Sequence, residues 1–289
     1  MSPDVASAAI RGLAFALLFQ ACGAVFFLAL FGRMVDRSAR PIRRLALTVA
    51  LCGCAVVGIQ LLLDASRMTG EYAGLFDTDM QRLALTTPGA VARMLQMAAL
   101  LAIAYGMWKW PSAGSPTAGG PTALMGALIA AAAFLLAGHT ATHPWRPILA
   151  PLLLVHLLVV AYWFGSLVPL YLALRRESAG VAADVVAAFS RLALWLVPVL
   201  ALAGIALVLG IARGIPPFDE PYGALILVKA SAFAVLMGIA GLNKLRLAPA
   251  IARGQQSARN ALQAFIAIEA VIIVGVLVTT AVLTTFYSP

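Results

Sequence analysis

Long apolar runs separated by short polar segments form the dominant pattern of this chain. A membrane-spanning helix needs about 20 apolar residues, and eight stretches of the sequence approach or exceed that length. They cover about residues 9–31, 45–65, 89–109, 122–140, 149–174, 189–212, 222–243 and 262–286. Because backbone groups in lipid have to hydrogen-bond within their own segment, each stretch is expected to be a helix. The pattern predicts an all-α fold, a polytopic membrane helix bundle with eight transmembrane helices.

The segments between these runs are too short to hold a separate soluble domain. We therefore expect a single transmembrane domain over residues 1–289, with helices one to four in 1–150 and helices five to eight in 151–289. The first apolar run, Ala14 to Phe31, is too long for the core of a cleavable signal peptide and is expected to be the first membrane helix.

Composition narrows the class of protein further. Hydrophobic residues make up 63% of the chain and charged residues 11%, against about 25% charged residues in an average soluble domain. The mean hydropathy is +0.98. A soluble fold of this size cannot bury so much apolar surface and still cover itself with polar groups. This excludes a water-soluble enzyme, a disordered chain and a nucleic-acid-binding module, although the net charge is +9.

The basic residues gather in the loops that follow the odd-numbered helices. These loops carry Arg33, Arg37, Arg40, Arg43, Arg44, Lys109, Arg175, Arg176, Lys244, Arg246, Arg253 and Arg259. The opposite side carries fewer basic residues and most of the acidic ones. Since loops rich in Lys and Arg stay in the cytoplasm, both termini are predicted to lie outside. The longest outer segment, about residues 66–87, is then acidic, which suits a cation arriving from outside.

The three histidines are expected near the outer surface. His139 and His143 are placed at the outer end of helix four, where Pro144 disfavours helical geometry at His143. His156 lies in helix five, which should run antiparallel to helix four because their connection is short. The imidazoles can then converge, and imidazole binds copper, zinc and similar metals. Alternatively, the first two are ordinary interfacial residues and His156 hydrogen-bonds to another helix.

Methionines add soft donors near the same surface. Met94 and Met97 share one face of helix three, and Met68 and Met80 lie in the polar outer segment. A thioether suits Cu(I), but methionine is also a common packing residue. The predicted metal ligands are His139, His143, His156, Met94, Met97, Met68 and Met80. Cys22, Cys52 and Cys54 lie inside apolar runs and are expected to be packing residues rather than a thiolate metal site.

Ionisable side chains within a span cost roughly 2.5–3.5 kcal/mol each on insertion scales. Besides His156, they are Asp64, Arg93, Lys229 and Glu269. Asp64 and Arg93 are expected either to pair or to line a substrate path. Lys229 and Glu269 are offset by roughly 10 Å along the membrane normal, so Asn243 or Arg246 is the better partner for Glu269. We expect Asp64, Arg93, Lys229, Asn243 and Glu269 to be structural or gating residues.

The second half of the chain carries an ordered series of short motifs. They are Trp163-Phe164-Gly165-Ser166-Leu167, Phe189-Ser190 with Gly204, Tyr222-Gly223 with Lys229, Asn243 to Pro249, and Glu269. In this order and spacing they resemble the copper resistance protein D (CopD) family, also seen as the membrane part of CopC–CopD fusions. Ser166 stands where the family pattern has a second glycine, and a dense methionine-rich outer tract is absent. The resemblance covers about residues 160–289 and is looser in the first half.

The resemblance implies a multi-pass protein of the bacterial inner membrane that takes copper, as Cu(I) or Cu(II), from the periplasm and moves or delivers it inward. It also implies a CopC-like periplasmic donor and a role in copper resistance or homeostasis. We do not expect an enzyme, because the sequence shows no nucleophile–base pair and no open three-ligand zinc motif. Two alternatives stay open: a b-type haem redox protein with His139 and His156 as axial ligands, and a scaffold for oxidase assembly.

Overall fold

Eight helical spans cross the length of the bundle in the computed structural model, which describes residues 2–110 and 119–287. The spans are α1 (Pro3–Phe31), α2 (Ala39–Thr69), α4 (Pro88–Lys109), α5 (Gly119–Ala132) with a 3₁₀ turn to Leu136, α7 (Arg146–Arg176), α8 (Ala179–Ile211), α9 (Pro221–Leu242) continued through a π-helical turn into α10 (Ala248–Ala252), and α11 (Gln256–Phe286). The described residues contain no strand. The all-α fold and the eight predicted spans are confirmed.

Several helices begin at residues that satisfy their first free backbone N–H groups. The side chain of Thr87 accepts a hydrogen bond from the N–H of Ala90, and Pro88 takes the first helical position of α4. Ser178 caps α8 in the same way, through the N–H of Val181. Short polar side chains at this position stabilise a helix start by about 1 kcal/mol. α4 therefore begins within one residue of its predicted start at 89, whereas α8 begins ten residues before the apolar run predicted at 189.

The prediction of a continuous fourth helix to residue 140 is wrong. α5 ends at Ala132, a 3₁₀ turn follows, and Gly138 has a φ of +86° that an L side chain rarely adopts. His139 instead opens a separate short helix, α6 (His139–Thr142), and His143 is already in extended backbone. The outer segment is also more ordered than a loop, since it contains a 3₁₀ turn at Tyr72–Leu75 and the helix α3 (Thr78–Leu85).

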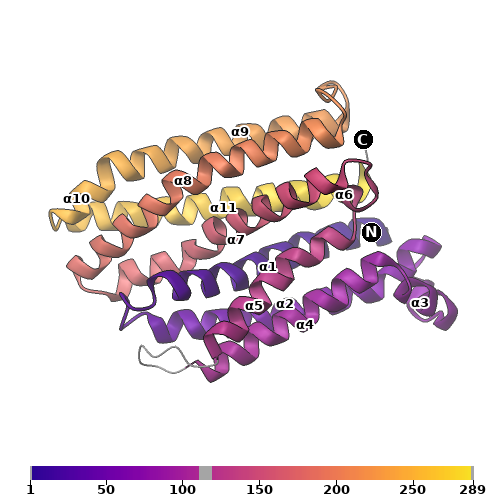
Figure 1. The fold of residues 1–289 in the computed structure, drawn as a ribbon, viewed down its shortest axis with the longest axis horizontal. Helices are drawn as coiled ribbons and strands as arrows, with labels where there is room; N and C mark the ends of the chain where they lie inside the picture. Colours follow the sequence, from indigo (N-terminus) through magenta and orange to yellow (C-terminus); the bar gives the residue numbers. More distant parts are fainter. Residues whose placement is uncertain (1, 111–118, 288–289) are drawn as a thin grey trace.

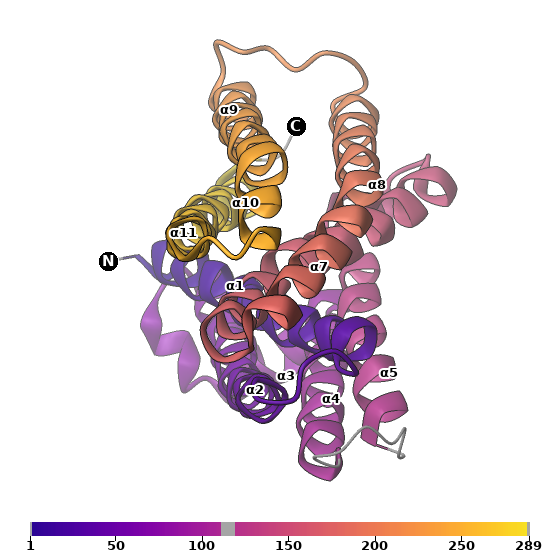
Figure 2. The same ribbon diagram turned by 90° about the vertical axis from the view of Figure 1, so that its left-hand side faces the viewer.

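The helices form two connected groups (Figure 1). α1 lies in the middle and packs against α2 and α5 of the N-terminal half and against α7 and α11 of the C-terminal half. α8 packs against α7 and against α10, whereas α9 packs against α11 and lies apart from α8 over much of its length (Figure 2). Both termini, α3 and α6 lie at one end of the bundle, which we call the terminal end; α10 lies at the other, the α10 end.

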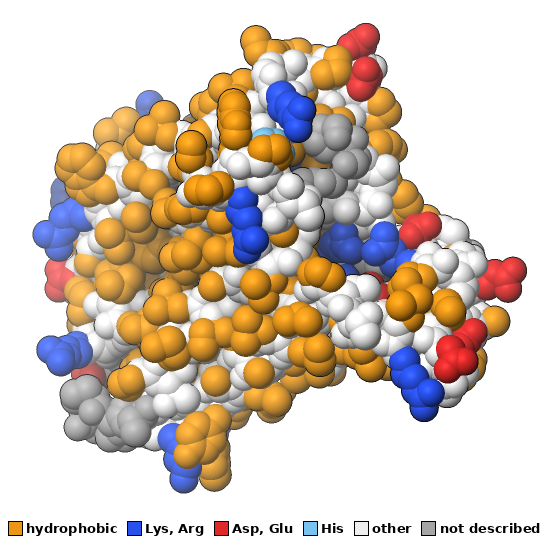
Figure 3. Space-filling view, turned by 45° about the vertical axis from the view of Figure 1, so that its right-hand side comes forward, with side chains coloured by type: hydrophobic (Ala, Val, Ile, Leu, Met, Phe, Trp, Pro, Cys, Tyr) orange, Lys and Arg blue, Asp and Glu red, His pale blue; other side chains and the backbone are white. Residues whose placement is uncertain are grey.

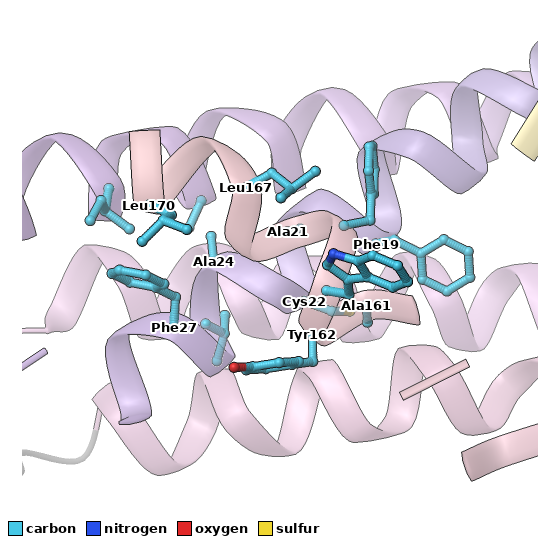
Figure 4. Close-up of a cluster of buried hydrophobic side chains, with 14 of the residues drawn as sticks. Phe19, Ala21, Cys22, Ala24, Phe27, Ala161, Tyr162, Leu167 and Leu170 are labelled. Atoms are coloured by element: carbon cyan, nitrogen blue, oxygen red, sulfur yellow. The ribbon is translucent and has the colours of Figure 1, made fainter. Parts of the chain in front are cut away.

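The closest helix approach joins the two halves where α1 crosses α7. Gly23 and Gly165 face each other there, and a Cβ on either glycine would overlap the backbone of the other helix. Gln20 adds a hydrogen bond from its Nε2 to the carbonyl oxygen of Gly165 at 2.8 Å. Figure 4 shows Phe19 and Cys22 of α1 packed with Ala161 and Tyr162 of α7 around this crossing. Small residues at a crossing let two membrane helices approach closely enough for extensive packing.

Candidate functional site

Three motif side chains meet inside the C-terminal half, each from a different part of the chain. Glu269 of α11 is only 4% exposed, and Asn243 donates a hydrogen bond from its Nδ2 to Oε1 of this carboxylate at 2.7 Å. The side chain of Trp163 on α7 also hydrogen-bonds to Glu269. The predicted pairing of Glu269 with Asn243 is therefore confirmed. No ion pair to Glu269 is found within the described ranges.

Glu269 and Asn243 line a cavity of about 270 Å³ between α7, α8, α9 and α11. Most of its wall is apolar, with Leu167, Phe189 and Met237 among the contributing side chains; Ser190 and Lys244 add polar groups. The Oδ1 atom of Asn243 is buried and has no hydrogen-bond partner in the described part of the chain. The cavity thus presents an acidic group and a free amide oxygen inside an otherwise apolar wall.

A second motif group surrounds His156, which lies on α7 nearer the terminal end. Its imidazole lies against Gly204 of α8, where an added Cβ would stand 3.3 Å from the Cε1 atom of the ring. Lys229 of α9 is close enough to interact electrostatically with the imidazole. The Nδ1 atom of His156 is buried without a hydrogen-bond partner among the described residues. The ring also interacts with the backbone of Leu200 on α8. Gly204 therefore makes room for a buried imidazole that lies directly against α8.

The other two histidines lie at α6. The Nδ1 atom of His143 accepts a hydrogen bond from the backbone N–H of Trp145 at 3.1 Å, while its Nε2 atom is buried and has no partner within the described chain. His139 is the first residue of α6, but its side chain lies outside the described part. The convergence of His139, His143 and His156 stays a prediction.

The four methionines occupy different environments. Met97 packs against Gly58 of α2, whereas Met94 is 42% exposed on the surface of α4. Met68 lines a cavity at the terminal end, and Met80 lies half-buried on α3. Among the described side chains, which do not include that of His139, no three of His, Cys, Asp or Glu are grouped as a metal site would require. The seven predicted ligands are thus spread over α2, α3, α4, α6 and α7.

The predicted pairing of Asp64 with Arg93 is confirmed. The Nη1 atom of Arg93 lies 2.5 Å from Oδ2 of Asp64, and each side chain is 13% exposed. A second ion pair joins Arg67 to Asp4 at 3.0 Å. Both pairs link helices of the N-terminal half at the terminal end. Because each arginine meets an acid, these charges stabilise the packing of α1, α2 and α4 and are not free to bind a cation.

Two family models match this sequence. Residues 1–144 match the model described as copper resistance protein D-like, N-terminal domain, and residues 183–283 match the model described as copper resistance protein D. The chain belongs to the copper resistance protein D family. No curated protein and no solved structure matched it.

The CopD assignment makes this chain a multi-pass membrane protein related to copper resistance. Four of the motif residues described above, Gly204, Lys229, Asn243 and Glu269, lie within the CopD match. His156 and Trp163 lie between the two matched ranges, although both contact residues of the CopD match. The CopD match covers α9 and most of α8 and α11, and the two polar groups lie between these helices and α7.

Sequence reasoning did not find every residue of these two regions. The motif around Trp163 does not indicate that its side chain is a partner of Glu269, and no sequence pattern marks Met237 as a residue of the cavity. The side chain of Trp163 reaches Glu269 only because α7 packs against α11. The local sequence offers one indication, which is that Trp163 stands two residues before Gly165, a glycine at which two helices pack closely.

Proposed function

We propose that this CopD protein takes up copper at the terminal end of the bundle and passes it through the C-terminal half toward the α10 end. The terminal end would face the periplasm and the α10 end the cytoplasm of a bacterial inner membrane. The many basic residues in the loops at the α10 end support this orientation, because such loops remain cytoplasmic. The chain would act as one transmembrane domain, since α1 packs against helices of both halves.

The observation that carries the proposal is the buried imidazole of His156, whose Nδ1 atom lies against Gly204 and makes no well-aligned hydrogen bond in the described chain. A buried polar atom normally has a well-aligned hydrogen-bond partner, and an ionisable side chain inside a membrane bundle is a candidate functional position. Neutral imidazole nitrogen is a good ligand for copper ions. The family's link to copper resistance makes copper the cargo to test first.

Copper would reach His156 from the histidines of α6, His139 and His143. The unused Nε2 atom of His143 supports this step, because it is a second ring nitrogen without a protein partner among the described residues. Met68, Met80, Met94 and Met97 are proposed as further soft ligands along the way, as the affinity of thioethers for Cu(I) suggests. A CopC-like periplasmic protein is the proposed donor.

Lys229 and the pair of Glu269 with Asn243 are proposed to gate the path. The ammonium group of Lys229 interacts with the imidazole of His156 and opposes a second positive charge there. Copper held by His156 would therefore be bound loosely enough to leave. Glu269 lines the next cavity along the bundle and offers a negative charge to an arriving cation.

Copper retention by the purified protein tests this proposal. The chain is loaded with Cu(I) in detergent under reducing conditions, desalted, and analysed for copper per protein. We expect the native chain to retain about one copper ion, and His156→Asn, which keeps a polar group of similar size, to lose it. The double variant His139→Ala/His143→Ala should load more slowly. Uptake of copper into vesicles then tests movement across the membrane.

Thermal stability provides the control for these variants. His156→Asn should melt within a few degrees of the native chain, because asparagine keeps a side-chain N–H that can still donate to the backbone of Leu200. A native chain that emerges without copper would overturn the metal assignment. A Soret band in the same sample would then favour a haem protein, and a copurifying membrane complex without metal would favour an assembly scaffold.

A further inference from the structure

A cavity of about 670 Å³ opens at the terminal end of the N-terminal half. It lies between the last turns of α2, the first turn of α4 and the segment from the end of α5 to the start of α7. Arg67, Arg93 and Arg146 line it, together with Asp64. Figure 3 shows Lys and Arg side chains gathered in a hollow on this side of the molecule. We call it the arginine cavity.

The charges around the arginine cavity do not cancel. Arg93 pairs with Asp64, and Arg67 pairs with Asp4. Arg146 forms no ion pair within residues 2–110 and 119–287. Among the outer acidic residues, Asp79 pairs with Arg82 on the exposed surface of α3, and Glu71 and Asp77 do not line the cavity.

Arg11 adds a further positive charge behind the cavity wall. Its Nη1 atom donates to the backbone carbonyl of Thr284 at 3.0 Å, and its charge interacts with Arg67, Arg93 and Asp64. It has no acid partner in the described chain either. Four guanidinium groups thus face two carboxylates, which leaves an excess of two positive charges in and beside one cavity.

The start of α4 strengthens the same potential. Thr87, Pro88 and Gly89 line the cavity, so the positive end of a 22-residue helix points into it. The guanidinium of Arg93 lies over this turn, because a Cβ at Gly89 would stand 3.2 Å from its Nη1 atom. Helix N-termini combined with arginine side chains are a recurrent way to hold a phosphate group.

We propose that the arginine cavity binds a phosphate group, from an anionic lipid of the adjacent leaflet or from free phosphate. Two uncompensated guanidinium charges match a phosphate dianion and exceed the single negative charge of a phosphodiester, and the planar donors of arginine match the oxygen atoms of both. The cavity is larger than one phosphate and is also lined by Met68 and Leu136, which leaves room for the rest of a lipid headgroup. The same charge disfavours a copper ion inside this cavity, although Met68 lines it. Copper would therefore reach His156 by way of the histidines of α6 rather than through the arginine cavity.

Binding of two probes to the delipidated protein in detergent tests the site, without copper present. Orthophosphate is measured by equilibrium dialysis, and phosphatidylglycerol is measured by native mass spectrometry against diacylglycerol, which lacks the phosphate. We expect the native chain to bind at least one of the two phosphate-bearing probes and not diacylglycerol. Raising the salt concentration should weaken the binding, because part of the attraction is electrostatic.

Arg146→Gln is the decisive variant, because Arg146 is exposed and its loss breaks no ion pair recorded in the described chain. We expect it to weaken binding by about tenfold, as the loss of one charged hydrogen-bond donor predicts. Arg82→Gln is the matched control, since Arg82 lies at the same end on α3 but does not line the cavity, and its binding should stay within about twofold of native. The proposal is overturned if the native chain binds neither probe, or if Arg146→Gln binds as tightly as the native chain.

Discussion

The two halves of this protein surround a buried carboxylate differently. In the N-terminal half, Asp64 and Arg93 lie on neighbouring helices and form an ion pair in which each side chain is 13% exposed. In the C-terminal half, Glu269 and Lys229 lie on α11 and α9, and the described residues offer neither of them an opposite charge. A paired charge contributes to the packing of its helices, whereas an unpaired one costs free energy and is retained where function needs it.

The two halves also differ in how much of each helix is buried, as α1 and α9 show. In the most apolar window of α1, 61% of the residues are buried, against 6% in the corresponding window of α9. Lys229 lies on α9 and Asn243 at its end. A segment with few buried contacts moves at a lower free-energy cost than a segment in the core. We therefore expect the N-terminal half to act as the rigid part and α9 as the part that moves during copper passage.

Gly165→Ala should have the largest effect on stability, because it separates the two halves at their closest contact. The new Cβ would overlap the carbonyl oxygen of Phe19 and the backbone of Gly23, and backbone atoms cannot move aside as a side chain can. We expect a loss of about 3 kcal/mol or more, at the upper end of the cost of overpacking. The yield of monodisperse protein and the melting temperature in detergent measure it.

Gly238→Ala provides the control for this substitution. Gly238 lies within α9, and an added Cβ there meets no atom within 4 Å. Alanine favours a helix over glycine by roughly 1 kcal/mol, so this variant should be as stable as the native chain or slightly more. Equal destabilisation by the two variants would contradict the role of the α1–α7 crossing.

Arg93→Gln should have the next largest effect, because it leaves Asp64 buried without its partner. We expect a loss of about 2 kcal/mol, somewhat below the cost of breaking a fully buried pair. The double variant Arg93→Gln/Asp64→Asn should recover part of that loss, since it removes both charges. A double-mutant cycle from thermal or denaturant unfolding measures the coupling. Additive effects of the two single substitutions would show that the pair does not stabilise this half.

The eight spans could be predicted because they depend only on the length of an apolar run. The two polar pairings could be predicted because they depend only on the depth of the residues in the membrane. An apolar run of sufficient length has to be a helix in lipid. Asn243 could be matched with Glu269, and Asp64 with Arg93, from their positions along their helices, since the rise per residue places each pair at a similar depth.

The parts that were not predicted depend on packing between distant segments. The break before His139 arises from the positive φ of Gly138, which the apolar run hides. The side chain of Trp163 reaches Glu269 only through the packing of α7 against α11. The arginine cavity was missed for the same reason, since Arg67, Arg93 and Arg146 come from three segments and the outer sequence reads as acidic.

Glu269→Gln tests whether the unpaired carboxylate of the C-terminal half serves function rather than packing. Glutamine keeps the side-chain shape and can still accept a hydrogen bond from Asn243, so stability should fall by no more than about 1 kcal/mol. Copper uptake into vesicles should fall by about tenfold, because the cavity loses its negative charge. A change in stability without a change in uptake would make Glu269 a packing residue like those of the N-terminal half.

Lys229→Met should have the smallest effect, and it should strengthen copper binding instead of weakening a property of the protein. Removing the ammonium group takes away the repulsion that it exerts on a cation bound at His156, so copper should be held more tightly, by about threefold. Release of copper from His156 would then be slower, so copper uptake into vesicles would not rise with the affinity. Competition with a Cu(I) chelator measures the change.

Lys109→Met is the control, because Lys109 stacks on Trp108 at the end of α4, away from His156. This variant should leave the copper affinity unchanged. If Lys229→Met left the affinity at the native value, Lys229 would not act on copper at His156, and the contrast between the two halves would rest on Glu269 alone.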